Sequence, residues 1–151
     1  MSSVSPRTFS RRTFSLLLPL LFLAICIPSM SAQERLSDKD IEHMMNNVKN
    51  DAKSFRSIFN KAVSKSTIRK TSQEKDAKTL VQSFENQTDG MLKQFQSTKK
   101  ADTTLPVVLQ SASQIERIKT DVALGPAVDS QWAKIRTELD TISQAFNAPS
   151  N

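Results

Sequence analysis

The residues best suited to bind something are six basic side chains gathered between positions 61 and 78. The segment reads KAVSKSTIRKTSQEKDAK and holds only two acids, Glu74 and Asp76. Basic side chains concentrated in this way attract anionic lipid, lipopolysaccharide or an acidic protein partner. The alternative is a solvated connection between two helices, and both interpretations stay open here. The six candidate contact residues are Lys61, Lys65, Arg69, Lys70, Lys75 and Lys78.

Nucleic acid is not an expected partner of this segment. No aromatic residue is interleaved with the basic side chains. Proteins that bind single strands combine positive charge with aromatic platforms on which bases stack. The segment therefore favours a lipid or protein partner.

A metal or cofactor site would have to use the single histidine or the methionines. His43 stands in IEHMM, beside the apolar stripe rather than in it, and is expected at the surface. Met44, Met45 and Met91 occur at helical spacing among phenylalanines, where methionine usually fills a core instead of binding copper. A haem site would need His43 to meet Met91, but His43 lies on the wrong side of its helix. We expect neither a metal nor a cofactor.

The residues needed for catalysis are also missing. Two glycines cannot build a dinucleotide fingerprint or a phosphate loop. The only cysteine, Cys26, lies in the apolar N-terminal segment and leaves with it, so thiol chemistry and cysteine-bound metals are not expected. A serine triad would need His43, and nothing marks a nucleophile near it. We expect a protein that is not an enzyme.

The first 32 residues are typical of a secretory signal peptide. Three arginines precede an apolar run at 14–27, which is too short for a membrane span. Small residues follow, and cleavage is expected after Ser31 or Ala32. Half of the formal net charge of +6 leaves with these arginines, which are Arg7, Arg11 and Arg12.

The export route has two interpretations. The sequence SRRTF around Arg11 and Arg12 resembles a twin-arginine signal, which exports folded proteins. The leucine-rich apolar run favours the ordinary secretory route instead. Either route predicts a periplasmic or extracellular protein.

Four segments show apolar residues at spacings of three and four, which predicts amphipathic helices. Ser37 is a suitable first cap, and Thr71 with Glu74 reads as a capping box for the second helix. Thr104 is expected to cap the third helix, which Gly125 closes. The expected helices cover about 38–63, 72–98, 105–124 and 127–147.

The fold class predicted is all-α, an antiparallel up-down-up-down four-helix bundle after a cleaved signal peptide, with residues 33–151 as one domain. Two helical hairpins that associate with another copy or a partner are the alternative. The only tryptophan is in phase with the apolar stripe of its helix and is expected in the core. The expected core comprises Ile41, Val48, Phe55, Phe59, Leu80, Phe84, Phe95, Ile115, Ile118, Trp132, Ile135, Leu139, Ile142 and Phe146.

Charged residues near the stripes give three smaller expectations. Asp51 breaks the apolar seam of the first helix and is expected to be exposed. Lys134 with Glu138, and Arg136 with Asp140, are spaced four apart and are expected to form ion pairs along the last helix.

Two stretches carry a resemblance to known proteins. These are the T-x-x-E and V-x-x-F-E pattern within 71–95 and the W-x-x-I-R-x-E-L sequence from Trp132 to Leu139. Together they resemble a group of uncharacterised exported bacterial helical-bundle proteins. The resemblance implies a helical bundle in the bacterial envelope, and it implies no activity and no site residues.

The function expected is therefore that of a non-catalytic exported module of the bacterial envelope, with a binding or structural role. Its contact with an anionic surface or acidic partner would run through the basic segment 61–78. The alternative is a periplasmic carrier that holds a small apolar ligand or cofactor between its helices.

Overall fold

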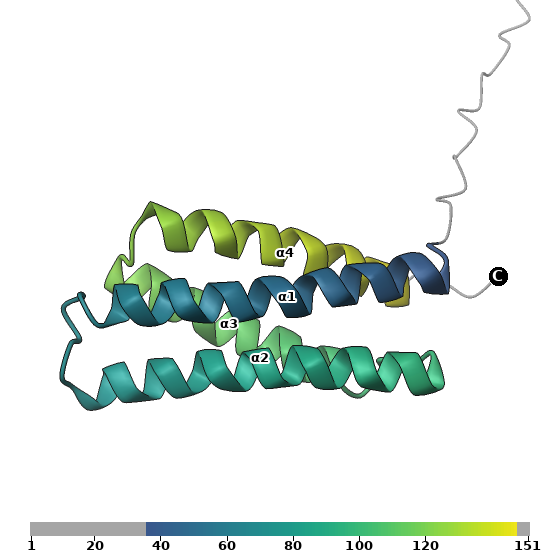
Figure 1. Cartoon of the computed structure of the whole chain (residues 1–151), viewed down its shortest axis with the longest axis horizontal. Coiled ribbons are helices and arrows are strands. Elements are labelled where there is room, and N and C mark those ends of the chain that lie inside the picture. Colours follow the sequence, from purple (N-terminus) through teal and green to yellow (C-terminus); the bar gives the residue numbers. More distant parts are fainter. Residues whose placement is uncertain (1–35, 148–151) are drawn as a thin grey trace, which may run out of the picture. The chain divides into compact units, whose positions relative to one another are not determined.

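The computed structural model describes residues 36–147, and this part of the chain contains four α-helices and no strand (Figure 1). The all-helical class predicted from the sequence is confirmed for these residues. The expected signal peptide, 1–32, lies outside the described residues. The helices are α1 (Asp38–Val63), α2 (Ser72–Thr98), α3 (Leu105–Val122) and α4 (Pro126–Asn147).

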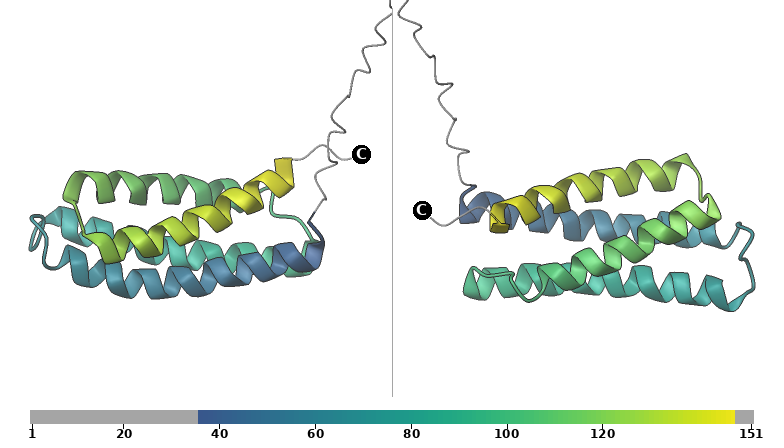
Figure 2. Two further views of the ribbon diagram at one scale, coloured as in Figure 1. Left: turned by 90° about the horizontal axis from the view of Figure 1, so that it is seen from above. Right: turned by 180° about the vertical axis from the view of Figure 1, so that it is seen from behind.

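The helices pack around a shared core with unequal contact. α1 packs against α2 and α4, α2 also packs against α3, and α3 and α4 touch each other least. The α1–α2 turn and the α3–α4 connection lie at one end, and the α2–α3 connection lies at the other (Figures 1 and 2). None of the helices in 36–147 is long and apolar enough to cross a membrane.

The turn between α1 and α2 extends further than the α3–α4 connection at the same end (Figure 2). The reason is helix length, because α1 and α2 have 26 and 27 residues whereas α3 and α4 have 18 and 22. This protruding turn carries the basic segment. The fold therefore presents those charges at one tip.

The first two helices begin at side-chain caps. Ser37 Oγ accepts from the backbone N–H of Asp40 at 3.2 Å, and Asp40 accepts from the Ser37 N–H at 3.3 Å, which completes a capping box. Thr71 Oγ1 accepts from the Glu74 N–H at 3.4 Å. The Glu74 carboxylate does not return to Thr71, however, and accepts from the Lys70 N–H instead. The capping box predicted for α2 is therefore only half formed.

The boundaries around α3 differ from those predicted. Thr104 precedes α3 but makes no capping hydrogen bond, and its buried Oγ1 has no partner among the described residues. Ala123 takes the left-handed conformation, with φ 49°, and donates to the Lys119 carbonyl, so α3 ends at Val122 instead of 124. α4 begins one residue earlier than expected, at Pro126, where a missing N–H costs nothing.

The core is formed by the apolar stripes of all four helices. Leu80, Ile118 and Phe146 are only partly buried and pack against its edge. Trp132 is buried between Phe55 and Phe84, with ring centroids 4.9 and 5.5 Å away. The other expected core residues are buried, namely Ile41, Val48, Phe55, Phe59, Phe84, Phe95, Ile115, Ile135, Leu139 and Ile142.

Asp51 is not exposed as predicted. Its side chain is only 14% exposed because it faces α4, where it lies 2.8 Å from Lys134 Nζ and accepts from Gln131 Nε2 at 3.3 Å. Lys134 pairs with Asp51 across the helices, so the predicted pair with Glu138 is absent from the described ion pairs. Burial, and then the Asp51 charge, raise the pKa of Glu138. The predicted Arg136–Asp140 pair is present at 3.0 Å.

Three ion pairs connect α1 with α2 or with Lys99, the C-cap residue of α2. Because their side chains are partly exposed, each pair adds little to stability. The pairs are Arg56–Glu85 at 2.9 Å, Lys49–Asp89 at 3.0 Å and Lys99–Glu42 at 3.2 Å.

Gly90 lies inside α2, and its replacement by alanine is expected to stabilise the protein. A Cβ atom at this position would meet no heavy atom within 4 Å. Alanine is favoured over glycine in a helix interior by about 0.8–1 kcal/mol. Urea unfolding of Gly90→Ala followed by circular dichroism should show a gain of that size, and a loss of stability would mean that this stretch of α2 packs more tightly than described.

Candidate functional site

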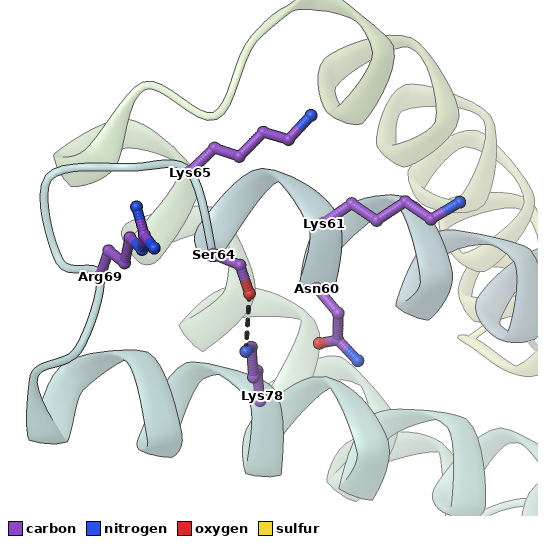
Figure 3. Close-up of a pocket in the computed structure, with 6 residues that line it drawn as sticks. All are labelled: Asn60, Lys61, Ser64, Lys65, Arg69 and Lys78. Carbon is purple, nitrogen blue, oxygen red and sulfur yellow. Dashed lines mark hydrogen bonds between the residues drawn. The ribbon is translucent and has the colours of Figure 1, made fainter.

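Four of the six predicted basic residues line one open cleft at the tip of the α1–α2 turn. The cleft has a volume of about 620 Å³. Figure 3 shows the side chains of Lys61, Lys65 and Arg69 reaching out from the end of α1 and the following turn, while Lys78 approaches Ser64 from α2. The lining residues are Asn60, Lys61, Ser64, Lys65, Arg69 and Lys78.

The other two basic residues lie beside this cleft. Lys75 lines a neighbouring hollow of about 350 Å³ on the outer face of α2, together with Glu74 and Lys78. Lys70 has a positive φ of 62°, and its backbone N–H points at Glu74. The structure thus brings four of the predicted contacts together and places two at the margin.

Glu74 organises the turn from within. Its Oε1 atom accepts from Lys78 Nζ at 2.6 Å and from Ser64 Oγ at 3.0 Å, and its Oε2 atom accepts from the Lys70 N–H at 2.5 Å. Lys78 Nζ also donates to Ser64 Oγ at 2.7 Å. One carboxylate therefore ties the end of α1, the turn and the start of α2 together.

These hydrogen bonds stabilise the ionised form of the carboxyl group. The bond from Lys78 contributes most, followed by those from the Lys70 N–H and from Ser64, and they lower the pKa of Glu74 to about 2. Glu74 is therefore ionised throughout the physiological range. Its negative charge is compensated within the turn by Lys78 and by the hydrogen bonds from Ser64 and the Lys70 N–H.

The remaining cations of the cleft have no such partner. Lys61, Lys65 and Arg69 are exposed and form no ion pair with any described residue, whereas Lys78 is paired with Glu74 at 2.6 Å. Neighbouring like charges repel one another and attract anions from solution. The cleft can thus bind an anionic group without breaking an existing ion pair.

Replacement of Glu74 by glutamine is expected to remove an acid-sensitive part of the stability. Because the folded pKa of about 2 lies below the ordinary value of 4.5, the ionised carboxylate stabilises the fold above pH 4.5 and loses this effect as the pH falls toward 2. Thermal unfolding should show Glu74→Gln melting below the wild type at pH 7, with the difference shrinking toward pH 2.

Asp76 provides a matched control for that experiment. It is an exposed carboxylate in the same turn of α2 and forms no ion pair with any described residue. Asp76→Asn should melt like the wild type at both pH values. Equal behaviour of the two variants would contradict the anchoring role of Glu74.

The residues considered for metal or cofactor chemistry differ in their burial. His43 is exposed and its Nδ1 lies 3.4 Å from Asn47 Nδ2, while Met45 and Met91 are buried and Met44 packs partly buried against the core. Within residues 36–147, no three histidine, cysteine, aspartate or glutamate side chains are grouped so as to hold a metal ion.

Trp132 is fully enclosed by protein groups. Its Nε1 donates to the Glu116 carboxylate, and Lys119 Nζ lies 5.9 Å from the centre of its ring. Lys119 in turn pairs with Asp129 at 3.2 Å. The indole N–H thus has a partner at the protein surface while the ring fills the core, as is common for buried tryptophan.

A second surface cleft lies between α3 and α4 and has a volume of about 480 Å³. It is lined by both acids and bases, including Glu116, Arg117, Asp121 and Arg136. Arg136 is paired with Asp140 at 3.0 Å. Because its charges are mixed, this cleft lacks the single sign that distinguishes the cleft at the α1–α2 turn.

Sequence analysis identified the basic residues but missed the polar groups among them. Asn60 lies in the last turn of α1 and Ser64 is the C-cap residue that follows the helix. Nothing in their residue types separates them from other polar surface residues. Ser64 and Glu74 are ten residues apart in the sequence, and the turn between the helices brings them into hydrogen-bond contact. A signal was available for Glu74 alone, through its capping position.

Comparison of the chain with protein-family models, with curated proteins and with solved structures finds no match.

Proposed function

We propose that this protein is a non-catalytic exported module of the bacterial envelope that contacts an anionic lipid surface through the α1–α2 turn. In this proposal the helices form an antiparallel up-down-up-down bundle, and residues 1–32 are a signal peptide that is removed. The observation that carries the proposal is a cleft at the protruding tip of the fold, lined by four cationic side chains, three of which form no ion pair with a described residue.

The position of the cleft supports contact with a surface. A flat membrane can reach the tip of a helical hairpin without colliding with the other helices, because the α1–α2 turn extends beyond the α3–α4 connection. Basic residues near an anionic membrane contribute about 1 kcal/mol each. Lys65, Arg69 and Lys70 are exposed in this turn, so their contribution should be sensitive to salt.

The rigidity of the turn supports a defined contact instead of a loose charged loop. Glu74 fixes the turn through three hydrogen bonds, and three successive backbone bonds close the end of α1, from Ser64, Lys65 and Ser66. A turn held in one conformation loses little conformational entropy on binding. The backbone that carries these cations therefore has its binding conformation before it meets the surface.

The proposal is tested by sedimentation of the chain 33–151 with lipid vesicles. This part of the chain forms one compact unit and holds the whole described core, so it should fold without the first 32 residues. It should sediment with vesicles of phosphatidylcholine and phosphatidylglycerol, but not with phosphatidylcholine alone. Rising salt should release it, since the Debye length falls to about 3 Å at 1 M.

The matched variants locate the contact. Changing Lys65, Arg69 and Lys70 to glutamine should weaken vesicle binding by about a hundredfold, from about 1 kcal/mol for each charge. A control with the same loss of charge, in which Lys39, Lys53 and Lys100 become glutamine, should bind nearly as the wild type does. Equal weakening of both would mean that net charge, not the turn, governs binding. Capture of an acidic protein without vesicle binding would replace the lipid by a protein partner.

A further inference from the structure

We infer that the cleft at the α1–α2 turn is a discrete site for a phosphate monoester group, with Arg69, Lys61 and Lys65 as charged donors and the Asn60 amide as a neutral donor. This inference rests on the proposed function and goes beyond it. Diffuse attraction requires only positive charge, whereas a discrete site requires directed donors and a shape.

The cleft carries an excess of positive charge that one small anion could balance. Glu74 neutralises Lys78, and its two carboxylate oxygens are occupied by three donors, so it does not reach the other cations. Lys61, Lys65 and Arg69 remain on one cleft without a counter-charge among the described residues. A phosphate monoester carries between one and two negative charges near neutral pH. It can therefore offset most of this excess by itself.

The end of α1 does not oppose an anion as strongly as a bare helix C-terminus would. The carbonyl groups of Asn60, Ala62 and Val63 accept from the N–H groups of Ser64, Lys65 and Ser66 at 3.0–3.1 Å. Lys61, in the last turn, further offsets the negative end of the helix dipole. The local field is therefore set by the cationic side chains.

Asn60 gives the cleft a neutral polar group that is not otherwise engaged. Its Oδ1 atom is shielded from solvent and has no hydrogen-bond partner among the described residues. Its Nδ2 group also donates to no described residue, and Asn60 lines the cleft. The Nδ2 hydrogens can therefore be donated to a phosphate oxygen in the cleft.

The hydrogen-bond donors of the cleft suit a phosphate group better than a carboxylate group. The planar guanidinium of Arg69 can bind two oxygens of one phosphate, and lysines add point charges around it. The volume of about 620 Å³ falls within the range of sites for small molecules, and is larger than a single carboxylate needs. Lys61, Lys65 and Arg69 are exposed, so an anion from solution can reach their charged groups.

The test is a calorimetric titration of the chain 33–151 with inorganic phosphate, alongside sedimentation with two kinds of vesicle. One vesicle contains phosphatidic acid, a monoester, and the other contains phosphatidylglycerol, a diester, at equal surface charge. Binding of inorganic phosphate together with a preference for phosphatidic acid supports the site and a lipid source. Binding of inorganic phosphate with no preference between the vesicles supports the site for a free phosphate compound.

Two variants that leave the basic character of the turn intact make the result specific. Arg69→Lys keeps the charge and removes the fork, and Asn60→Ala changes no charge at all. Each should weaken phosphate binding, Arg69→Lys by about tenfold, the equivalent of one charge-assisted hydrogen bond. Asn60→Ala, which lies outside the residues proposed to contact the lipid surface, should leave binding to phosphatidylglycerol within about twofold. Circular dichroism would check that both variants are folded.

The outcomes separate this inference from the proposed function. If both variants bind phosphate as the wild type does, or if the wild type binds no phosphate, the discrete site is overturned while contact with an anionic surface stands. If the wild type binds phosphate but ignores phosphatidylglycerol vesicles, the surface contact fails and the phosphate site stands.

Discussion

Replacing Trp132 with alanine is expected to lower the free energy of unfolding by about 3–5 kcal/mol, the usual cost of removing a large aromatic side chain from a core. Trp132 is 1% exposed and contacts both Phe55 and Phe84. Its loss would leave a cavity where α1, α2 and α4 meet. Urea unfolding followed by far-ultraviolet circular dichroism measures the change without relying on the tryptophan signal.

Phe146 is a matched control for this prediction, because it is an aromatic residue of the same helix that is only partly buried. It meets Phe95 edge to face, with ring centroids 6.0 Å apart. Phe146→Ala should therefore cost clearly less than Trp132→Ala. A loss below about 1 kcal/mol for Trp132→Ala would show that this tryptophan is not a core residue, and would reopen a role in binding.

The second large effect is expected for Phe55, the residue of α1 that lies against Trp132. Phe55 is fully buried and its ring centroid lies 5.3 Å from that of Phe59 as well as 4.9 Å from that of Trp132. Phe55→Ala should also cost about 3–5 kcal/mol. The double variant with Trp132→Ala should lose less than the sum, because each single change already removes their mutual contact.

A double-mutant cycle measures this coupling directly. Residues in contact commonly show coupling of about 0.5–3 kcal/mol. Because the double variant risks complete unfolding, the more conservative pair Phe55→Leu and Trp132→Phe serves as a second cycle. Strict additivity in the conservative cycle would contradict the packing of α1 against α4 through these two rings.

The sequence was sufficient to predict the helices where periodicity and caps agree. α1 and α2 have the ranges expected from their stripes, and Ser37 and Thr71 are their N-caps as expected, although the capping box of α2 is only half formed. The end of α3 was misjudged because Gly125 was taken as the residue that leaves the helix. Ala123 adopts the left-handed conformation first, and an alanine in this role gives no signal in a sequence.

Asp51 was misjudged because its partners lie on another helix. Periodicity indicates that a residue interrupts an apolar stripe, but not whether a facing helix supplies a cation. Gln131 and Lys134 of α4 meet Asp51 in three dimensions, which makes burial of its carboxylate tolerable. The Lys134–Glu138 pair was lost for the same reason, since a contact across helices competed with one along the helix.

The candidate site was visible in the sequence as a concentration of charge, and no more than that. Which cations are free depends on where Glu74 points, and its three donors are the C-cap residue of α1, the backbone of the turn and a lysine of α2. Without these contacts, Glu74 would be expected to neutralise any neighbouring base equally well. The structure distinguishes Lys78, which is paired, from Lys61, Lys65 and Arg69.

The most direct test of the central claim is to map amide chemical shifts of the chain 33–151 as phosphatidylglycerol bicelles are added. Contact through the α1–α2 turn predicts that the largest changes fall within residues 60–78, and that the Lys65, Arg69 and Lys70 glutamine variant abolishes them. Changes concentrated on α3 and α4, with residues 60–78 unaffected, would contradict the account.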